Sequence, residues 1–225
     1  MEKLIRGLLE FRRTALPALL PRLQSLAERQ APKTLFMTCS DSRVVPNLMV
    51  STEPGDLFVS RTVGNLVPRA DENGASTGDF AATACIEFAL HVLHVDDVIV
   101  CGHSRCGAMK ALLEQLPASP DLAHLAGWLE HARPSLDRLR RMTTLDPALP
   151  EYDQLSQANV LTQIDHVLSY PQIRDRVVHH DIGIHAWWWD IATGDLHIYD
   201  REEHRFALID ERMAERMLQR RSWSP

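Results

Sequence analysis

Two cysteines and a histidine stand where they could bind a single metal ion. His103 and Cys106 are separated by two residues in the segment CGHSRCGAMK, and Cys39 follows another apolar run in MTCSDSRVVP. Thiolate and imidazole groups are preferred ligands of Zn²⁺, and a zinc ion with three protein ligands keeps a fourth position open for water or substrate. The sequence therefore indicates a catalytic zinc site formed by Cys39, His103 and Cys106.

A carboxylate and a guanidinium group follow Cys39 at alternate positions. In CSDSR, an extended chain would place Cys39, Asp41 and Arg43 on one side. Asp41 could then accept a hydrogen bond from zinc-bound hydroxide, and Arg43 could hold that carboxylate ionised and oriented through a bidentate contact. From the spacing alone, a purely structural ion pair is an equally good explanation.

A nucleophilic role for Cys39 is the main chemical alternative. A cysteine phosphatase loop needs five residues between cysteine and arginine, whereas three residues separate Cys39 from Arg43. A dyad of Cys39 and His103 stays open, and it would need no metal. Removal of zinc together with activity by a chelator would exclude that dyad.

The elements that must position these groups form an α/β pattern. Apolar runs at 34–39, 56–63 and 96–103 predict strands, and helical spacing follows at 77–93 and 104–116. Thr77 or Asp79 could cap the first of these helices. Such strand, turn and helix units build parallel sheets, whose functional groups gather at the carboxyl ends of the strands. Both chemical motifs stand at such ends. We expect a mixed, mostly parallel central sheet flanked by helices.

The rest of the chain predicts further helices and one hairpin. Helical spacing over residues 2–15 predicts an amphipathic helix that ends near Pro17 and Pro21, within an N-terminal helical segment of about 2–28. The turn ATGD joins two strand-like runs within 181–200. Further helical patterns cover 122–141, 154–169 and a basic C-terminal stretch of about 207–221. With no linker or repeat, residues 1–225 are expected to form a single domain.

Composition limits the partners and the compartment. The 225 residues carry 24 Lys and Arg against 30 Asp and Glu, a net charge of −6, so no nucleic-acid partner is expected. The N-terminal apolar stretch is short and broken by prolines, so neither a signal peptide nor a membrane anchor is expected. Four cysteines are too few for a disulfide scaffold, and a reducing cytoplasm fits best. Cys85 and Cys101 lack ligand-spaced partners and are expected in the core.

Three segments together resemble the β-class carbonic anhydrases: CSDSRV, EPGDLFVSRTVGNLVP and VCGHSRCGAMKALL. The likeness extends over roughly residues 1–200, and the paired Cys-x-Asp-x-Arg and His-x-x-Cys motifs are specific when both occur in this order. Within the class, the chain is most similar to the plant-type and carboxysomal branch, without the C-terminal extension of the carboxysomal members.

The resemblance implies an activity and a site. It implies that Cys39, His103 and Cys106 bind Zn²⁺ and that Asp41 and Arg43 form a catalytic dyad. The implied reaction is the reversible hydration of CO2 to bicarbonate and a proton by attack of zinc-bound hydroxide, the reaction of a carbonate dehydratase, which is a lyase. It also implies a homodimer or higher homo-oligomer with sites near the subunit interface.

The same resemblance assigns a substrate pocket. Gln30, from its own or a neighbouring subunit, and the backbone N–H of Gly102 or of a neighbouring residue are expected to stabilise developing oxygen charge. Phe58, Phe88 and Val63 are expected to form an apolar pocket for CO2. Plant-type members usually carry tyrosine at the position of Phe88, so this chain lacks a hydroxyl group there.

Regulation and reaction type have alternatives in the family. Members with a bicarbonate-regulated closed site use a tryptophan, an arginine and a tyrosine where this chain has Phe36, Arg61 and Trp189, so no such regulatory site is expected. Two other functions stay open: a zinc hydrolase of carbonyl sulfide or carbon disulfide on the same fold, and a non-catalytic scaffold.

Overall fold

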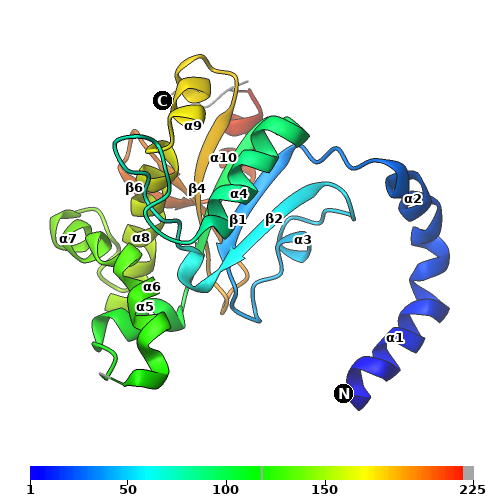
Figure 1. Cartoon of the computed structure of the whole chain (residues 1–225), viewed down its shortest axis with the longest axis horizontal. Coiled ribbons are helices and arrows are strands. Elements are labelled where there is room, and N and C mark those ends of the chain that lie inside the picture. The colour runs from blue at the N-terminus through cyan, green and yellow to red at the C-terminus, as the bar shows by residue number, and fades with distance from the viewer. Residues whose placement is uncertain (118, 220–225) are drawn as a thin grey trace.

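A six-stranded sheet forms the centre of the molecule, in a computed structural model that describes residues 1–117 and 119–219 (Figure 1). The strand order is β2-β1-β3-β4-β5-β6; the first four of these are parallel, β5 is antiparallel to β4, and β6 is antiparallel to β5. The expected mixed, mostly parallel sheet is confirmed. The strands are β1 (Thr34–Cys39), β2 (Leu57–Thr62), β3 (Asp97–His103), β4 (Gly183–Trp189), β5 (Leu196–Asp200) and β6 (Arg205–Leu208).

Strands β1 and β3 lie in the middle of the sheet because both of their faces are apolar. Phe36 of β1 and Val98 and Cys101 of β3 are completely buried. Continuous apolar runs of this kind are typical of parallel strands that are covered on both faces. The register pairs Thr38 with Cys101, so β1 and β3 end at the same edge of the sheet.

Helices cover both faces of the sheet and form the connections between its parallel strands. Helix α8 packs along β3 and β4, and its buried face includes polar side chains that bond to the loops around it. The helices of the main body are α3 (Pro46–Met49), α4 (Phe80–Phe88), α5 (Gly107–Leu113), α6 (Ala123–Leu129), α7 (Pro134–Arg141), α8 (Glu151–Leu168) and α9 (Pro171–Val178). Short 3-10 turns cover Val63–Asn65, Pro120–Leu122 and Glu130–Ala132, and α4 continues into a π-helical turn over Ala89–Leu93.

Helix α4 begins at one of its two predicted caps, and helix α5 begins later than the sequence pattern indicates. Helix α4 starts at Phe80 because the Asp79 carboxylate accepts a hydrogen bond from the backbone N–H of Ala81, so Asp79 is the cap. Helix α5 starts at Gly107 because the preceding residues form a turn in which Arg105 has φ +56°. The later start of α5 leaves the residues after β3 free to form a loop at the sheet edge.

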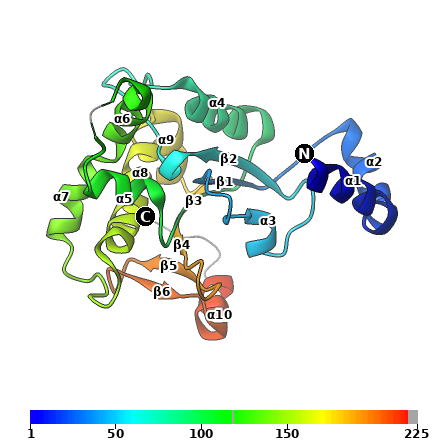
Figure 2. The same cartoon turned by 90° about the horizontal axis from the view of Figure 1, so that it is seen from below.

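The predicted N-terminal helix is confirmed: α1 (Glu2–Thr14) ends three residues before Pro17, and α2 (Leu16–Glu28) follows it with Ala15 between them. Pro17 stands in the first turn of α2, where its missing N–H has no helical partner to lose. No side chain of either helix is buried, and both views show the pair set apart from the body (Figures 1 and 2).

Other boundaries also differ from the sequence pattern. The predicted helix over 122–141 is broken by the turn at Glu130–Ala132, and the predicted C-terminal helix loses its start to β6, so α10 spans Glu211–Gln219. Residues 220 and 221 of that prediction lie outside the described residues. The hairpin within 181–200 is confirmed by the antiparallel pairing of β4 and β5. Helices α3 and α9 and strand β6 were not predicted.

Candidate metal centre

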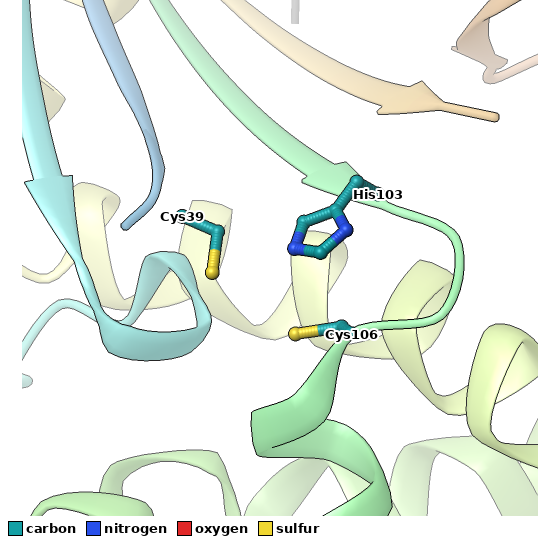
Figure 3. A group of neighbouring side chains, drawn as sticks. All are labelled: Cys39, His103 and Cys106. Atoms are coloured by element: carbon teal, nitrogen blue, oxygen red, sulfur yellow. The ribbon is translucent and has the colours of Figure 1, made fainter. Parts of the chain in front are cut away.

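Three side chains converge at the carboxyl edge of the parallel strands (Figure 3). Cys39 is the last residue of β1, His103 is the last residue of β3, and Cys106 directly precedes α5. Their ligand atoms all lie within 4.8 Å of one another, and all three residues are buried. The predicted convergence of these residues is therefore confirmed, because the common register of β1 and β3 brings their ends together.

The ring of His103 is oriented for metal binding. Its Nδ1 lies 2.8 Å from the carbonyl oxygen of Ser104, so Nδ1–H donates to that oxygen and Nε2 keeps its lone pair in the neutral ring. Nε2 is buried and has no hydrogen-bond partner among the residues that the structure describes. A buried polar atom without a partner is costly unless an ion or water satisfies it. The histidine therefore fits a metal ligand.

The two thiols need a cation in order to ionise together. The neighbouring Cys106 thiol, together with His103, lowers the pKa of Cys39 to about 4 despite burial. The same contact and burial hold the pKa of Cys106 well above its usual value, against the N–H groups at the start of α5. One sulfur ionises readily and the second does not, so a dication beside both is the natural complement.

Asp41 and Arg43 form a bidentate ion pair beside this cluster. Nε of Arg43 donates to Oδ1 of Asp41 at 2.9 Å, and Nη2 donates to Oδ2 at 2.7 Å. These bonds are the main cause that holds the pKa of Asp41 well below its usual range, so the carboxylate is ionised. Oδ2 lies 3.9 Å from Nε2 of His103. The contact is achieved in a turn, since β1 ends at Cys39 and the chain does not stay extended.

Arg61 holds the backbone of this turn. Its guanidinium group donates to the carbonyl oxygen of Cys39 at 3.1 Å and to that of Asp41 at 2.6 Å. Of the positions aligned with the regulatory residues, Phe36 is fully buried and packs edge-on against Trp187. Both contacts give Arg61 and Phe36 structural roles in this chain.

Helix α8 fixes the loop that carries His103 and Cys106. Asp153 accepts a hydrogen bond from the backbone N–H of Arg105 at 2.5 Å, and the hydroxyl of Ser156 donates to the carbonyl oxygen of His103 at 2.8 Å. Burial raises the pKa of Asp153. Asp153 and Ser156 were not predicted, because the only signal in the sequence was the polar content of a segment with helical spacing.

Side-chain hydrogen bonds also hold the loop of residues 63–64, which contacts Cys39. The backbone N–H of Gly64 donates to Sγ of Cys39 at 3.3 Å. The indole N–H of Trp128 donates to the carbonyl oxygen of Val63 at 2.8 Å, and Asn159 donates to that of Gly64 at 3.0 Å. Gly64 has φ +71°, a conformation that favours glycine. Trp128 and Asn159 were also missed, since nothing local links them to the cysteine.

Two of the five expected substrate residues, Val63 and Gly102, are next in sequence to residues of the metal-binding region. Val63 is 41% exposed directly beside Gly64, and Gly102 precedes His103. A side chain at Gly102 would lie 2.5 Å from Val160, so close packing against α8 also explains this glycine.

The other three substrate residues are not brought to the cluster within one chain. The rings of Phe58 and Phe88 stack at 5.6 Å, but Phe58 pairs with Leu35, four residues before Cys39. That spacing corresponds to about 13 Å along the strand. Gln30 is exposed and lines a surface hollow with Gly55 beyond the end of α2.

Comparisons with known proteins agree with this geometry. A family model described as carbonic anhydrase matches residues 34–196. A carbonic anhydrase of Pseudomonas aeruginosa is 39% identical over 219 residues, which cover 94% of this chain and 93% of the relative. The solved structure of the β-carbonic anhydrase CcaA has a TM-score of 0.82 at 34% identity and covers 96% of both chains. A tetrameric β-carbonic anhydrase from Sordaria macrospora has a TM-score of 0.72 at 26% identity, covering 88% of this chain and 97% of that one.

The sheet topology and the Cys-His-Cys group are thus those of a β-class fold with a potential metal site. The chain belongs to the carbonic anhydrase family and is an enzyme of its β class. Among the described residues, no helix has both the length and the apolar character needed to cross a membrane.

Proposed function

We propose that this enzyme catalyses the zinc-dependent, reversible hydration of CO2 to bicarbonate and a proton. One observation carries the proposal: the buried Nε2 of His103 and two cysteine sulfurs meet in a group that also faces an ionised carboxylate, that of Asp41. Cys39, His103 and Cys106 would hold the ion. When bound, zinc supplies a Lewis acid that makes water nucleophilic near neutral pH.

Asp41 orients the reacting oxygen. An ionised carboxylate only accepts hydrogen bonds, so Asp41 favours a protonated oxygen beside it and disfavours an unprotonated one. Arg43 fixes the carboxylate through two parallel bonds and keeps it ionised. The pair therefore selects one orientation of the water nucleophile and of the bicarbonate product.

The apolar part of the site is completed by a second copy of the chain. Val63 and the Gly102 backbone are supplied by the same chain as the metal ligands. Phe58, Phe88 and Gln30 lie too far along their elements to reach their own cluster, and Phe88 is 41% exposed. We assign these three residues to the site of a partner subunit, where two aromatic rings would hold apolar CO2 without strong binding.

The N-terminal helices provide the means of assembly. Leu4, Ile5, Leu8 and Leu9 of α1 are each more than half exposed, although apolar side chains on a helix normally pack against a partner. We propose a homo-oligomer in which α1 and α2 pack on a second copy. The tetrameric relative from Sordaria macrospora supports assembly of this kind.

A reducing compartment such as the cytoplasm suits the site. Cys39 and Cys106 have sulfurs within 4.8 Å of each other, and both must stay as thiolates to bind zinc.

The test is stopped-flow CO2 hydration by the purified protein, together with its zinc content. We expect hydration that rises with pH through neutrality and is lost when a chelator removes zinc. Full turnover by the zinc-free protein would overturn the proposal and favour a metal-free dyad of Cys39 and His103. Carbonyl sulfide and carbon disulfide are assayed in parallel, and a strong preference for either would reassign the substrate.

A further inference from the structure

The backbone of Arg105 links helix α8 to the ion pair of Asp41 and Arg43. Its N–H group donates a hydrogen bond to Oδ1 of Asp153 at 2.5 Å, and its carbonyl oxygen accepts one from Nη2 of Arg43 at 3.1 Å. Arg105 lies in the short loop that follows β3 and runs beside the metal centre (Figure 3). One loop residue is therefore bonded to a carboxylate of α8 on one side and to the guanidinium group of Arg43 on the other.

The conformation of this loop needs support. Arg105 has φ +56°, in the left-handed region, which is costly for residues other than glycine. The preceding residue, Ser104, is fixed to the end of β4: its N–H donates to the carbonyl oxygen of Trp189 at 2.8 Å, and its hydroxyl donates to Asp190 at 3.0 Å. Ser104 thus anchors the start of the loop, and Asp153 holds Arg105 itself in the left-handed conformation.

The start of α8 places Asp153 for this contact. Asp153 lies in the first turn of the helix, where the helix dipole favours a carboxylate, and it is only 4% exposed. Burial of a carboxylate costs free energy unless hydrogen bonds compensate for the lost water. An apolar side chain would fill this space at lower cost, so the carboxylate is explained by the hydrogen bond that it accepts from Arg105.

The carbonyl oxygen of Arg105 fixes Arg43 relative to the metal ligands. Asp41 and Arg43 belong to one turn, so their ion pair by itself could move as a unit. Nη2 of Arg43 donates both to Oδ2 of Asp41 and to the carbonyl oxygen of Arg105. The second of these bonds ties the turn after β1 to the loop between His103 and Cys106, which carries two of the three expected metal ligands.

We propose that Asp153 is a positioning residue for Asp41 and Arg43 and that it acts through the backbone of Arg105. By holding Arg105 in the left-handed conformation, Asp153 directs the Arg105 carbonyl oxygen at Arg43 and so fixes the ion pair beside the metal centre. The kinetic consequence rests on the proposed hydration reaction, in which Asp41 orients the reacting oxygen. The structural consequence, restricted motion of Arg43, is independent of that reaction.

NMR of ¹⁵N-labelled, zinc-loaded, full-length protein measures how fast the Arg43 guanidinium group rotates, with no substrate present. We expect Asp153→Leu, which removes the acceptor at similar volume, to speed this rotation by about tenfold, the usual effect of weakening one hydrogen bond to a charged group. Asp153→Asn keeps an acceptor oxygen and should stay near the original rate. Asp153→Ala is measured in parallel, so that the test does not depend on how a leucine packs.

The control for this measurement is Asp165→Leu, which removes a carboxylate of the same helix that pairs with Arg138. A purely structural role of Asp153 would leave the rotation of Arg43 as it is in the control. Equal rotation rates in the Asp153→Leu, Asp153→Ala and Asp165→Leu proteins would therefore overturn the proposal. The backbone amide spectrum shows that each variant is folded.

Kinetics test the route through Arg105. Asp153→Leu should lower kcat/KM for CO2 hydration, measured per bound zinc, by about tenfold. Because glycine adopts the left-handed conformation readily, the same substitution in an Arg105→Gly background should cost much less. Equal losses in the two backgrounds would refute the route. The NMR measurement needs no turnover, so a failure of this inference is distinguished from a failure of the proposed hydration reaction.

Discussion

Nε2 of His103 and Oδ2 of Asp41 lie 3.9 Å apart, although the two residues are 62 positions apart in the sequence. The first atom has a free lone pair and the second is an ionised acceptor that Arg43 holds in place. A donor atom for a metal and an acceptor for a proton therefore face the same small volume. This relationship links metal binding to the orientation of the nucleophile, and the predictions below test its parts.

Substitution of a predicted ligand should remove the metal. We expect Cys106→Ser to weaken zinc affinity by more than about 100-fold, because the loss of even an outer partner of a ligand costs about 10- to 100-fold. Competition with a chromophoric chelator measures the affinity. Cys85→Ser is the matched control, because Cys85 is a partly exposed residue of α4 outside the proposed ligand set. Equal affinity in the two variants would contradict the proposed ligand set.

Arg43→Gln should impair the orientation of the reacting oxygen without affecting metal binding. Loss of the two parallel bonds frees the Asp41 carboxylate, and we expect kcat/KM to fall by about 100-fold with zinc content unchanged. The control is Arg133→Gln, which removes an exposed arginine that pairs with Glu130. Unaltered kcat/KM in Arg43→Gln would reduce the dyad to a structural ion pair.

The same variant should change the titration of Asp41. Because Arg43 depresses the pKa of Asp41, the pair stabilises the fold above the carboxyl group's usual pKa, and this contribution is lost as the pH falls through the depressed value. In Arg43→Gln the pKa should rise toward its usual value. Carboxyl ¹³C NMR over the acid range measures it. No upward movement would show that Arg43 is not the cause.

Trp128→Phe should weaken the hydrogen bond that the backbone N–H of Gly64 donates to Sγ of Cys39. The variant keeps an aromatic ring but loses the N–H that holds Val63, so the Gly64 N–H no longer points firmly at the sulfur. We expect the thiolate-to-metal absorption band of the Co²⁺-loaded protein to move to lower energy, because a thiolate with a weaker hydrogen bond is a stronger donor.

Trp187→Phe is the control for that experiment. The indole N–H of Trp187 is buried and has no hydrogen-bond partner among the described residues, so its loss breaks no bond. Identical bands in both variants would show that the hydrogen bond from Trp128 to Val63 does not affect the sulfur of Cys39.

Charge on the exposed face of α1 should disrupt assembly. We expect Leu8→Glu to yield smaller species by light scattering and to lower CO2 hydration, since Gln30, Phe58 and Phe88 would no longer reach a neighbouring site. Val178→Glu places the same charge on another exposed apolar position, in α9, and should leave the mass unchanged. A Leu8→Glu protein of unaltered mass would exclude α1 from the interface.

The convergence of Cys39, His103 and Cys106 could be predicted from the sequence alone. Both strands that end in these groups are short apolar runs with clear stops, and parallel strands place their ends together. Asp41 was placed near the metal by assuming an extended chain, whereas the structure uses a turn. Asp41 nevertheless lies beside His103, because Arg43 and Arg61 hold the turn, which no local pattern reveals.

The supporting residues could not be predicted in the same way. Asp153, Ser156 and Asn159 act on loops that are between 48 and 95 residues away in the sequence, so their roles depend on how α8 packs. By contrast, the spacing over residues 2–15 did predict α1, which ends at Thr14 ahead of Pro17. Pro17 lies in the first turn of α2, where a proline is tolerated.

Helix α8 touches both sides of the metal centre: Asp153 and Ser156 hold the strand end that carries His103, and Asn159 holds the backbone beside Cys39. This one helix thus sets the distance between ligands that come from different strands. Heating cannot move the ligands apart while α8 stays packed on the sheet. Release of the ion and collapse of the tertiary structure should consequently occur in one cooperative melting event, with no metal-free native form appearing at lower temperature.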